Sequence, residues 1–353
     1  MERDNAIGIS FTAGSYLLWG ILPIYWKFLS GVPALEILAH RVIWSFCFVL
    51  IIVIILKRKL LKSFFQVQMS KKKTWIGLFI ASLFISINWL TYIFAVNANH
   101  IVEASLGYYI NPLISVLLGV FVLREKINVL HAVSFAIAGI GVIYMTITFG
   151  KFPWIALLLA FSFGFYGLSK KLIKVDSILG LLLETLFVFP FAFLFLVYIT
   201  MNGRESFLTG SPKIDLFLLG SGIATALPLL LFGIGAQKIP LYMVGFFQYI
   251  TPTISLLLGV LMYNEPFTKD HAITFTCIWL AIVIFTVSNI HQGLRKRKVT
   301  TAPVVRGVSK RQRCVLVKTE RTKNKSLHLF AVQASYWLFQ VIKILDIAKK
   351  NHD

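Results

Sequence analysis

The stretch LGYYINPLISVLLGVFVLRE, residues Leu106–Glu125, occurs twice in this chain. Its second copy is FFQYITPTISLLLGVLMYNE, residues Phe246–Glu265. The offset between the copies is constant, because Pro112 corresponds to Pro252 and about half of the positions from Tyr109 to His131 recur 140 residues later. An internal repeat of this quality indicates a fold built from two related halves.

The composition predicts an integral membrane protein. Of 353 residues, 58% are hydrophobic and 14% are charged, whereas soluble domains carry about 25% charged residues. Apolar runs of about 20 residues, the length of a membrane-spanning helix, recur along the chain. The net charge of +21 does not indicate nucleic-acid binding by the membrane part, because the basic residues cluster in particular loops between the apolar runs.

Ten membrane-spanning helices are expected, and the fold class is therefore all-α. The predicted spans are Ile7–Leu29, Ala34–Leu56, Thr74–Val96, Ala104–Leu123, Ile127–Thr148, Phe152–Leu168, Ser177–Thr200, Leu216–Ala236, Leu241–Tyr263 and Ala272–Ile290. Each is long enough to cross the bilayer at a rise of about 1.5 Å per residue.

Lysine and arginine are distributed asymmetrically between the two sets of loops. One set holds 18 of these residues and the other holds 4, so the first set, with both ends of the ten-helix body, is predicted to be cytoplasmic. The repeated stretches are five spans apart, and five is odd, so they run in opposite directions. We therefore expect two inverted five-helix repeats, residues 1–148 and 149–298, an architecture typical of secondary transporters.

Residues 299–353 form a third region of different character. Residues 299–325 are polar and basic, and residues 326–349 have an amphipathic pattern. We expect a basic cytoplasmic extension without a transport role, or a helix lying on the anionic inner leaflet.

Charged residues inside predicted spans are costly, which makes each of them a candidate for function. Glu36, His40 and Arg41 lie in the second span, and Glu184 lies in the seventh. Because these spans enter from opposite sides, Arg41 and Glu184 are expected to meet as a charge pair. The pair would serve gating or binding, or would be a fixed structural ion pair.

A second group of polar and aromatic residues is predicted to line a substrate path. Its members are Asn88, Trp89, Tyr92, Tyr108, Asn111, Gln248 and Tyr249. Pro112 and Pro252 would kink their helices and free the carbonyl groups four residues earlier, which provides substrate contacts at the repeat interface. The alternative is that these kinks only shape the bundle.

Four further features are interpreted structurally. Ser115 and Gly119 form a small-xxx-small pair that favours close helix packing. Glu103 is expected to stabilise the start of its own helix, with proton coupling as the alternative. Trp26 is expected in an interfacial aromatic belt, and Tyr166 is a candidate to face the cavity.

The chain contains no motif for nucleotide, metal or nucleophilic catalysis, so no cofactor, no metal and no enzyme activity are predicted.

These patterns resemble the drug/metabolite transporter superfamily in its EamA branch. The residues that carry the resemblance are Glu36, His40–Arg41, Trp44–Ser45, Asn88–Trp89, residues 103–108, Asn111–Pro112, Leu183–Thr185, Pro190, Gln248–Tyr249 and Pro252. The resemblance covers about residues 5–298 and implies a multi-pass inner-membrane permease, expected to be an exporter. Such permeases end near Lys298, so the extension departs from the pattern.

The expected function is secondary transport of a small organic metabolite or drug by alternating access across the lipid bilayer. Uptake is the alternative within transport. Other classes are a membrane-embedded enzyme acting on a lipid-linked substrate, and a sensor or structural subunit whose basic tail binds a partner. Proton or ion coupling, the substrate and the oligomeric state stay open.

Overall fold

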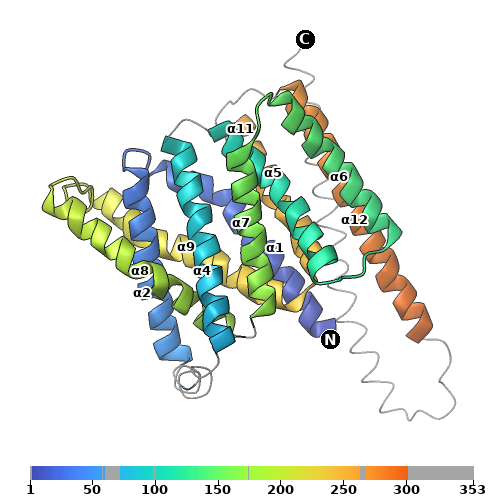
Figure 1. Ribbon diagram of the computed structural model, residues 1–353, viewed down its shortest axis with the longest axis horizontal. Coiled ribbons are helices and arrows are strands. Elements are labelled where there is room, and N and C mark those ends of the chain that lie inside the picture. Colours follow the sequence, from blue (N-terminus) through green and yellow to red (C-terminus); the bar gives the residue numbers. More distant parts are fainter. Residues whose placement is uncertain are drawn as a thin grey trace. The chain divides into compact units, whose positions relative to one another are not determined.

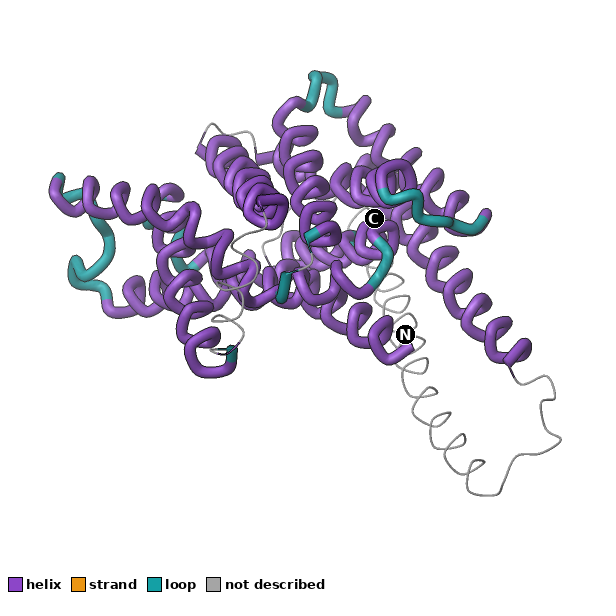
Figure 2. The backbone as a smooth tube through the Cα atoms, turned by 60° about the horizontal axis from the view of Figure 1, so that its bottom comes forward, coloured by secondary structure: helices purple, strands orange, loops and turns teal. Residues whose placement is uncertain are grey.

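Long helices dominate the computed structural model, which describes residues 2–57, 59, 72–97, 101–173, 175–262 and 268–300. No strand occurs in these ranges (Figure 2). Within them, ten helical segments are long and apolar enough to cross a membrane. The predicted all-α membrane fold is therefore confirmed, while the extension from residue 301 onward lies outside the described residues.

The helices keep the labels of Figure 1. They are α1 (Glu2–Lys27), α2 (Ala34–Leu56), α4 (Lys72–Asn97), α5 (Ile101–Leu117), the π-helix η1 (Leu118–Val122), α6 (Val129–Thr148), α7 (Trp154–Leu172), α8 (Ser177–Met201), α9 (Pro212–Lys238), α10 (Leu241–Gln248), α11 (Ile250–Met262) and α12 (Lys269–Thr300).

The two copies of the repeated stretch differ in their local geometry. The second copy is divided into α10 and α11, with Tyr249 between them, three residues before Pro252. Proline lacks a backbone N–H and its ring crowds the preceding turn, which accounts for a break at this place. The first copy continues as an α-helix through Pro112 to Leu117 and then becomes the π-helix η1. The kink at Pro112 stays a prediction.

The described chain forms two compact units. One comprises residues 1–126 and 145–265, and the other comprises residues 127–144 with the described residues after 265. In the second unit, α6 packs along α12. Asn128 donates a hydrogen bond of 2.8 Å to Ser288, and the Tyr144 hydroxyl donates one of 2.7 Å to Asp270.

Packing inside the first unit is reciprocal. Helix α1 packs against α9 and α11, whereas α7 packs against α4 and α5. The first helix of each sequence repeat thus contacts the third and fourth helices of the other repeat. The second helices, α2 and α8, pack against each other.

The repeated stretches meet where α5 crosses α10. A Cβ atom at Gly245 would lie 2.7 Å from the carbonyl oxygen of Pro112 and 3.2 Å from Cβ of Ser115. The Ser115 hydroxyl donates a hydrogen bond of 3.0 Å to Oε1 of Gln248. A Cβ at Gly119 would lie 2.9 Å from the backbone nitrogen of Tyr242. The predicted packing role of Ser115 and Gly119 is confirmed, because small residues let the backbones approach.

Two glutamates cap helices other than their own. Glu125, which follows η1, accepts hydrogen bonds from the backbone nitrogens of Leu241 at 2.7 Å and Tyr242 at 2.9 Å, at the start of α10. Glu103 lies in the first turn of α5 and accepts from the backbone nitrogen of Ile155 at 2.7 Å, at the start of α7.

Glu103 lies in the first turn of its own helix, as expected, and its carboxylate also binds the first turn of α7. The physical reason is that the first amides of a helix have no carbonyl partner and attract an anion. Helix α5 packs along α7, which brings the carboxylate within reach of such amides. The effect of Glu103 on the start of α5 stays a prediction. Glu265, the counterpart of Glu125, lies outside the described residues.

Replacing Gly245 with Ala tests the crossing of α5 and α10. The added methyl would press on the Pro112 carbonyl, and we expect the free energy of unfolding in detergent to fall by about 1–3 kcal/mol. Gly139→Ala is the matched control, because a Cβ at this other helical glycine meets no atom within 4 Å and alanine favours helix. Equal thermal unfolding midpoints for the two variants would argue against a tight crossing.

Candidate functional site

Side chains from three other helices contact Arg41 of α2. Its Nε donates a hydrogen bond of 2.9 Å to the Thr225 hydroxyl of α9. The guanidinium carbon lies 4.7 Å from the ring centroid of Trp26 in α1 and 5.6 Å from that of Trp89 in α4. Both distances fall within the range of cation–π contact. Among the described residues, no carboxylate forms an ion pair with Arg41.

Two tyrosines extend this group. The rings of Tyr92 in α4 and Tyr108 in α5 are 6.3 Å apart and are 38% and 43% exposed. Both lie near Arg41. We call Trp26, Arg41, Trp89, Tyr92 and Tyr108 the arginine cluster. It combines one cation, two indole faces and two phenol hydroxyls.

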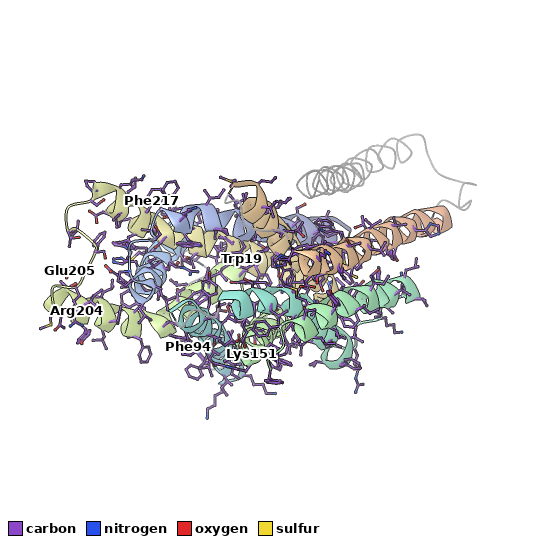
Figure 3. All side chains as sticks on the ribbon, turned by 90° about the horizontal axis from the view of Figure 1, so that it is seen from above. Trp19, Phe94, Lys151, Arg204, Glu205 and Phe217 are labelled. Carbon is purple, nitrogen blue, oxygen red and sulfur yellow. The ribbon has the colours of Figure 1, made fainter. Side chains whose placement is uncertain are left out.

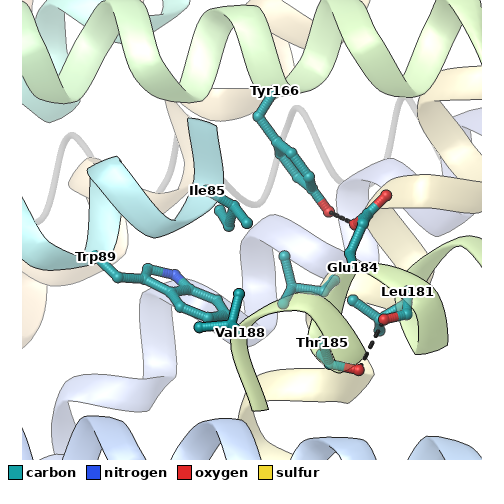
Figure 4. Close-up of a pocket in the computed structure, with 8 residues that line it drawn as sticks. Ile85, Trp89, Tyr166, Leu181, Glu184, Thr185 and Val188 are labelled. Carbon is teal, nitrogen blue, oxygen red and sulfur yellow. Dashed lines mark hydrogen bonds between the residues drawn. The ribbon is translucent and has the colours of Figure 1, made fainter. Parts of the chain in front are cut away.

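Glu184 of α8 is the centre of a second group. Its Oε1 accepts a hydrogen bond of 2.7 Å from Nζ of Lys170, and its Oε2 accepts one of 3.2 Å from the Tyr166 hydroxyl (Figure 4). The side chains of Lys170 and Glu184 are only 3% and 2% exposed. We call Tyr166, Lys170 and Glu184 the glutamate cluster. It is a buried ion pair completed by a neutral donor.

The predicted pairing of Arg41 with Glu184 is wrong, because Glu184 binds Lys170 and Arg41 binds Thr225 and two indoles. The sequence pattern ended the sixth span at Leu168 and assigned Lys170 to a loop. In the structure α7 continues to Leu172, which carries Lys170 into the bundle. A Cβ at Gly233 would lie 3.4 Å from Cε of Lys170, so the absence of a side chain there makes room for the lysine.

A small cavity joins the two clusters. Its volume is about 10 Å³, close to the space that one water molecule requires. Its lining residues are Ile85, Trp89, Tyr166, Leu181, Glu184, Thr185, Val188 and Leu229. Trp89 of the arginine cluster and Glu184 of the glutamate cluster lie on opposite sides of it (Figure 4). Tyr166 lines this small cavity, and its place on a substrate cavity stays a prediction.

Glu36 and His40 contact the loop between α8 and α9. Glu36 accepts hydrogen bonds from the backbone nitrogen of Ser206 at 2.6 Å and from its hydroxyl at 2.9 Å. The His40 ring lies 4.9 Å from that of Phe207 and accepts a hydrogen bond of 3.0 Å from the Trp44 indole. Figure 3 labels Arg204 and Glu205, which precede Ser206 in this loop. These contacts hold a loop in place.

The amides of Asn88 and Gln248 join helices. Asn88 Nδ2 donates to the Leu159 carbonyl at 2.9 Å and to the Ser162 hydroxyl at 3.1 Å, which ties α4 to α7. Gln248 accepts the hydrogen bond from Ser115, which ties α10 to α5. Both side-chain amides therefore already form hydrogen bonds between helices.

Asn111 and Tyr249 are buried but, unlike Asn88 and Gln248, each has a polar oxygen without a hydrogen-bond partner among the described residues. Asn111 is 9% exposed and Tyr249 is 1% exposed. Within the described ranges, neither Asn111 Oδ1 nor the Tyr249 hydroxyl has a hydrogen-bond partner. Unpaired buried oxygens of this kind call for an explanation, such as a water molecule or a ligand.

Trp26, one residue before the end of α1, lies over the Arg41 guanidinium, a contact that the sequence did not predict. Its place in an interfacial belt stays a prediction. Sequence reasoning also missed Thr225 and Lys170. A polar residue in an apolar helix is a signal for Thr225, but its partner depends on which helices pack together. For Lys170 the signal was the neighbouring glycines, Gly180 and Gly233, which acquire meaning only in three dimensions.

Glu184→Gln tests the buried pair. The change leaves the Lys170 cation without a counter-ion, and we expect the free energy of unfolding to fall by about 3–5 kcal/mol. Removing both charges, as Lys170→Met with Glu184→Leu, should restore most of that loss. Asp4→Asn is the control, because it removes a carboxylate from the exposed 2.8 Å pair with Lys238 and should have little effect. A Glu184→Gln loss as small as that of the control would contradict a tightly paired Glu184.

Comparison with known proteins places this architecture among transporters. The model of the EamA-like transporter family matches the chain twice, over residues 6–147 and 152–287. The YojE protein of Bacillus subtilis, described as an uncharacterized transporter, is 50% identical over 294 residues, which are 82% of this chain and 96% of that protein. The RarD protein of Escherichia coli is 40% identical over 296 residues, covering 84% and 99%.

A solved crystal structure supports the fold, with a TM-score of 0.59 at 20% sequence identity over 81% of this chain and 97% of the other. The apolar helices and the bacterial relatives describe a multi-pass inner-membrane transporter. The two family matches together span more than half of the chain. The chain belongs to the EamA-like transporter family.

Proposed function

We propose that this protein is a secondary carrier that exports a small organic solute by alternating access. The observation that carries the proposal is the reciprocal packing of α1 on α9 and α11 and of α7 on α4 and α5. When two halves make equivalent contacts, each can adopt the conformation of the other. Interchange of these two conformations opens a central site first to one side of the membrane and then to the other. No catalytic role is part of the proposal.

The two repeats, residues 1–148 and 149–298, are proposed to be inverted relative to each other. The asymmetry of lysine and arginine between the loops supports this arrangement. It also supports cytoplasmic positions for both ends of the ten-helix body. The extension at residues 299–353 is proposed to be dispensable for transport.

The crossing of α5 and α10 is proposed to act as the pivot of the exchange. Gly245 lies against the Pro112 backbone there, and Ser115 binds Gln248. Both repeated stretches lose regular α-helical geometry at or beside the crossing, at η1 in the first copy and at Tyr249 in the second. Such irregular segments are places where a helix bends.

The arginine cluster is proposed to contribute Trp89, Tyr92 and Tyr108 to the substrate path. Asn111 and Tyr249, whose oxygens have no partner in the described part of the chain, are proposed to meet substrate or water along it. Asn88 and Gln248 complete the proposed lining from the two inter-helix contacts.

Cysteine accessibility tests the inversion. In a chain whose Cys47, Cys277 and Cys314 are replaced by serine, Lys126→Cys and Lys269→Cys would be made separately. We expect a membrane-impermeant thiol reagent to label Lys269→Cys in intact cells, and Lys126→Cys only after the cells are opened. Lys238→Cys is the control for the cytoplasmic side. Labelling of both test positions from the same side would refute the inverted arrangement.

A metabolite comparison tests transport and its direction. Cells without the protein should accumulate particular solutes, and both the full chain and a chain ending at Lys298 should remove them. Solutes that are instead depleted in cells without the protein would establish uptake. An identical metabolite profile with and without the protein would contradict the carrier function, and loss of the effect on truncation would support a role for the extension.

A further inference from the structure

We propose that Arg41 binds the oxyanion group, a carboxylate or a phosphate, of the transported solute, and that the substrates are therefore organic anions with a planar apolar part. The inference rests on the proposed carrier function and adds the substrate class and the residue that recognises it. It follows from a comparison of the two clusters: Glu184 has an oppositely charged partner, and Arg41 has none among the described residues.

Arg41 and Glu184 both lie in the second helix of their repeat. Each lies seven residues after the first residue of the second helix of its repeat, Ala34 in α2 and Ser177 in α8. The charge at Glu184 is neutralised by Lys170 at 2.7 Å. Arg41 has no such partner among the described carboxylates. Within the described residues, the buried acid has a cation beside it, whereas the partly buried cation has no acid.

Glu36, the acidic residue nearest to Arg41 in the sequence, does not serve as its counter-ion. Glu36 lies five residues before Arg41, and both of its carboxylate oxygens accept hydrogen bonds from Ser206. An uncompensated cation inside a membrane-spanning helix is costly and marks a functional site by default. A solute that brings its own negative charge would remove that cost.

The guanidinium is oriented for such a ligand. Thr225 accepts the hydrogen bond from Nε, which fixes the plane of the group. The two terminal nitrogens form no hydrogen bond within the described part of the chain, and the side chain is only partly buried. Two parallel N–H donors of this kind match the two oxygens of a carboxylate or phosphate.

The surrounding rings suit the rest of an organic anion. Trp26 and Trp89 hold the guanidinium by cation–π contact at 4.7 and 5.6 Å and offer indole surface beside it. Tyr92 and Tyr108 are partly exposed and bring hydroxyl donors that also favour an anion. Stacking on rings favours a planar apolar solute. A cation would be repelled by Arg41, and Glu184, the acid that would attract one, is already bound to Lys170.

The test repeats the metabolite comparison with cells that make the full chain, Arg41→Gln, Arg41→Lys or Lys213→Gln, with each protein quantified in the membrane. Lys213→Gln is the matched control, because Nζ of Lys213 also lies over an aromatic ring, Phe28, at 4.9 Å. We expect the solutes exported by the full chain to be anionic at neutral pH. Arg41→Gln should reduce their export at least about 10-fold, and Lys213→Gln should not.

Arg41→Lys keeps the charge but loses the planar fork, so its KM for the identified solute should rise about 10-fold. If Arg41→Gln does not accumulate in the membrane, the KM of Arg41→Lys tests the proposal instead. An unchanged KM, and an unchanged preference for the acid over its uncharged amide, would overturn the proposal.

Exported solutes that are neutral or cationic, or full export by Arg41→Gln, would also overturn it and leave the carrier function standing. If no solute depends on the full chain, the carrier function itself fails and this inference fails with it.

Discussion

The close approach of α5 and α10 is the constraint on which the rest of this structure depends. The first copy of the repeated stretch contributes the Pro112 backbone and the Ser115 hydroxyl, and α10 contributes Gly245 and Gln248. In lipid, apolar side chains gain little from burial against each other, so association depends on close packing and on polar contacts between helices. Gly245 against the Pro112 carbonyl oxygen provides the close packing, and the Ser115–Gln248 hydrogen bond provides the polar contact.

The bundle contains two charges of opposite sign, the buried Glu184 and the partly buried Arg41, and their surroundings differ. Glu184 has a full set of partners in Lys170 and Tyr166, whereas Arg41 has a hydroxyl and two indoles. The small cavity beside Trp89 and Glu184 lies between them. A buried, complete ion pair stabilises one arrangement of helices, and an incomplete one provides a place for a ligand. The complete ion pair at Glu184 fits a structural role, and the absence of a described acid beside Arg41 is the basis of the proposed solute site.

Much of the candidate site was visible as residue types but not as contacts. Trp89, Tyr92 and Tyr108 were predicted for the path, and they gather at Arg41. Arg41 and Glu184 were predicted as a pair and have separate partners. Glu103 and Glu125 were recognisable as helix-terminal acids, but the helices that they cap begin elsewhere in the chain, at Trp154 and Leu241. In each case the sequence singled out the residue, and its partner depended on which helices are neighbours.

The sequence by itself determined the ten apolar helices, the repeat of Leu106–Glu125 and the family, because a helix in lipid satisfies its own backbone and its length and polarity can be read locally. Tertiary structure alone decided that α7 carries Lys170 to Glu184 and that α1, α4 and α9 meet around Arg41. Those contacts depend on which helices pack together and on the rotation of each about its axis. A shift of one residue along a helix turns a side chain by about 100°, so hydropathy cannot fix that rotation.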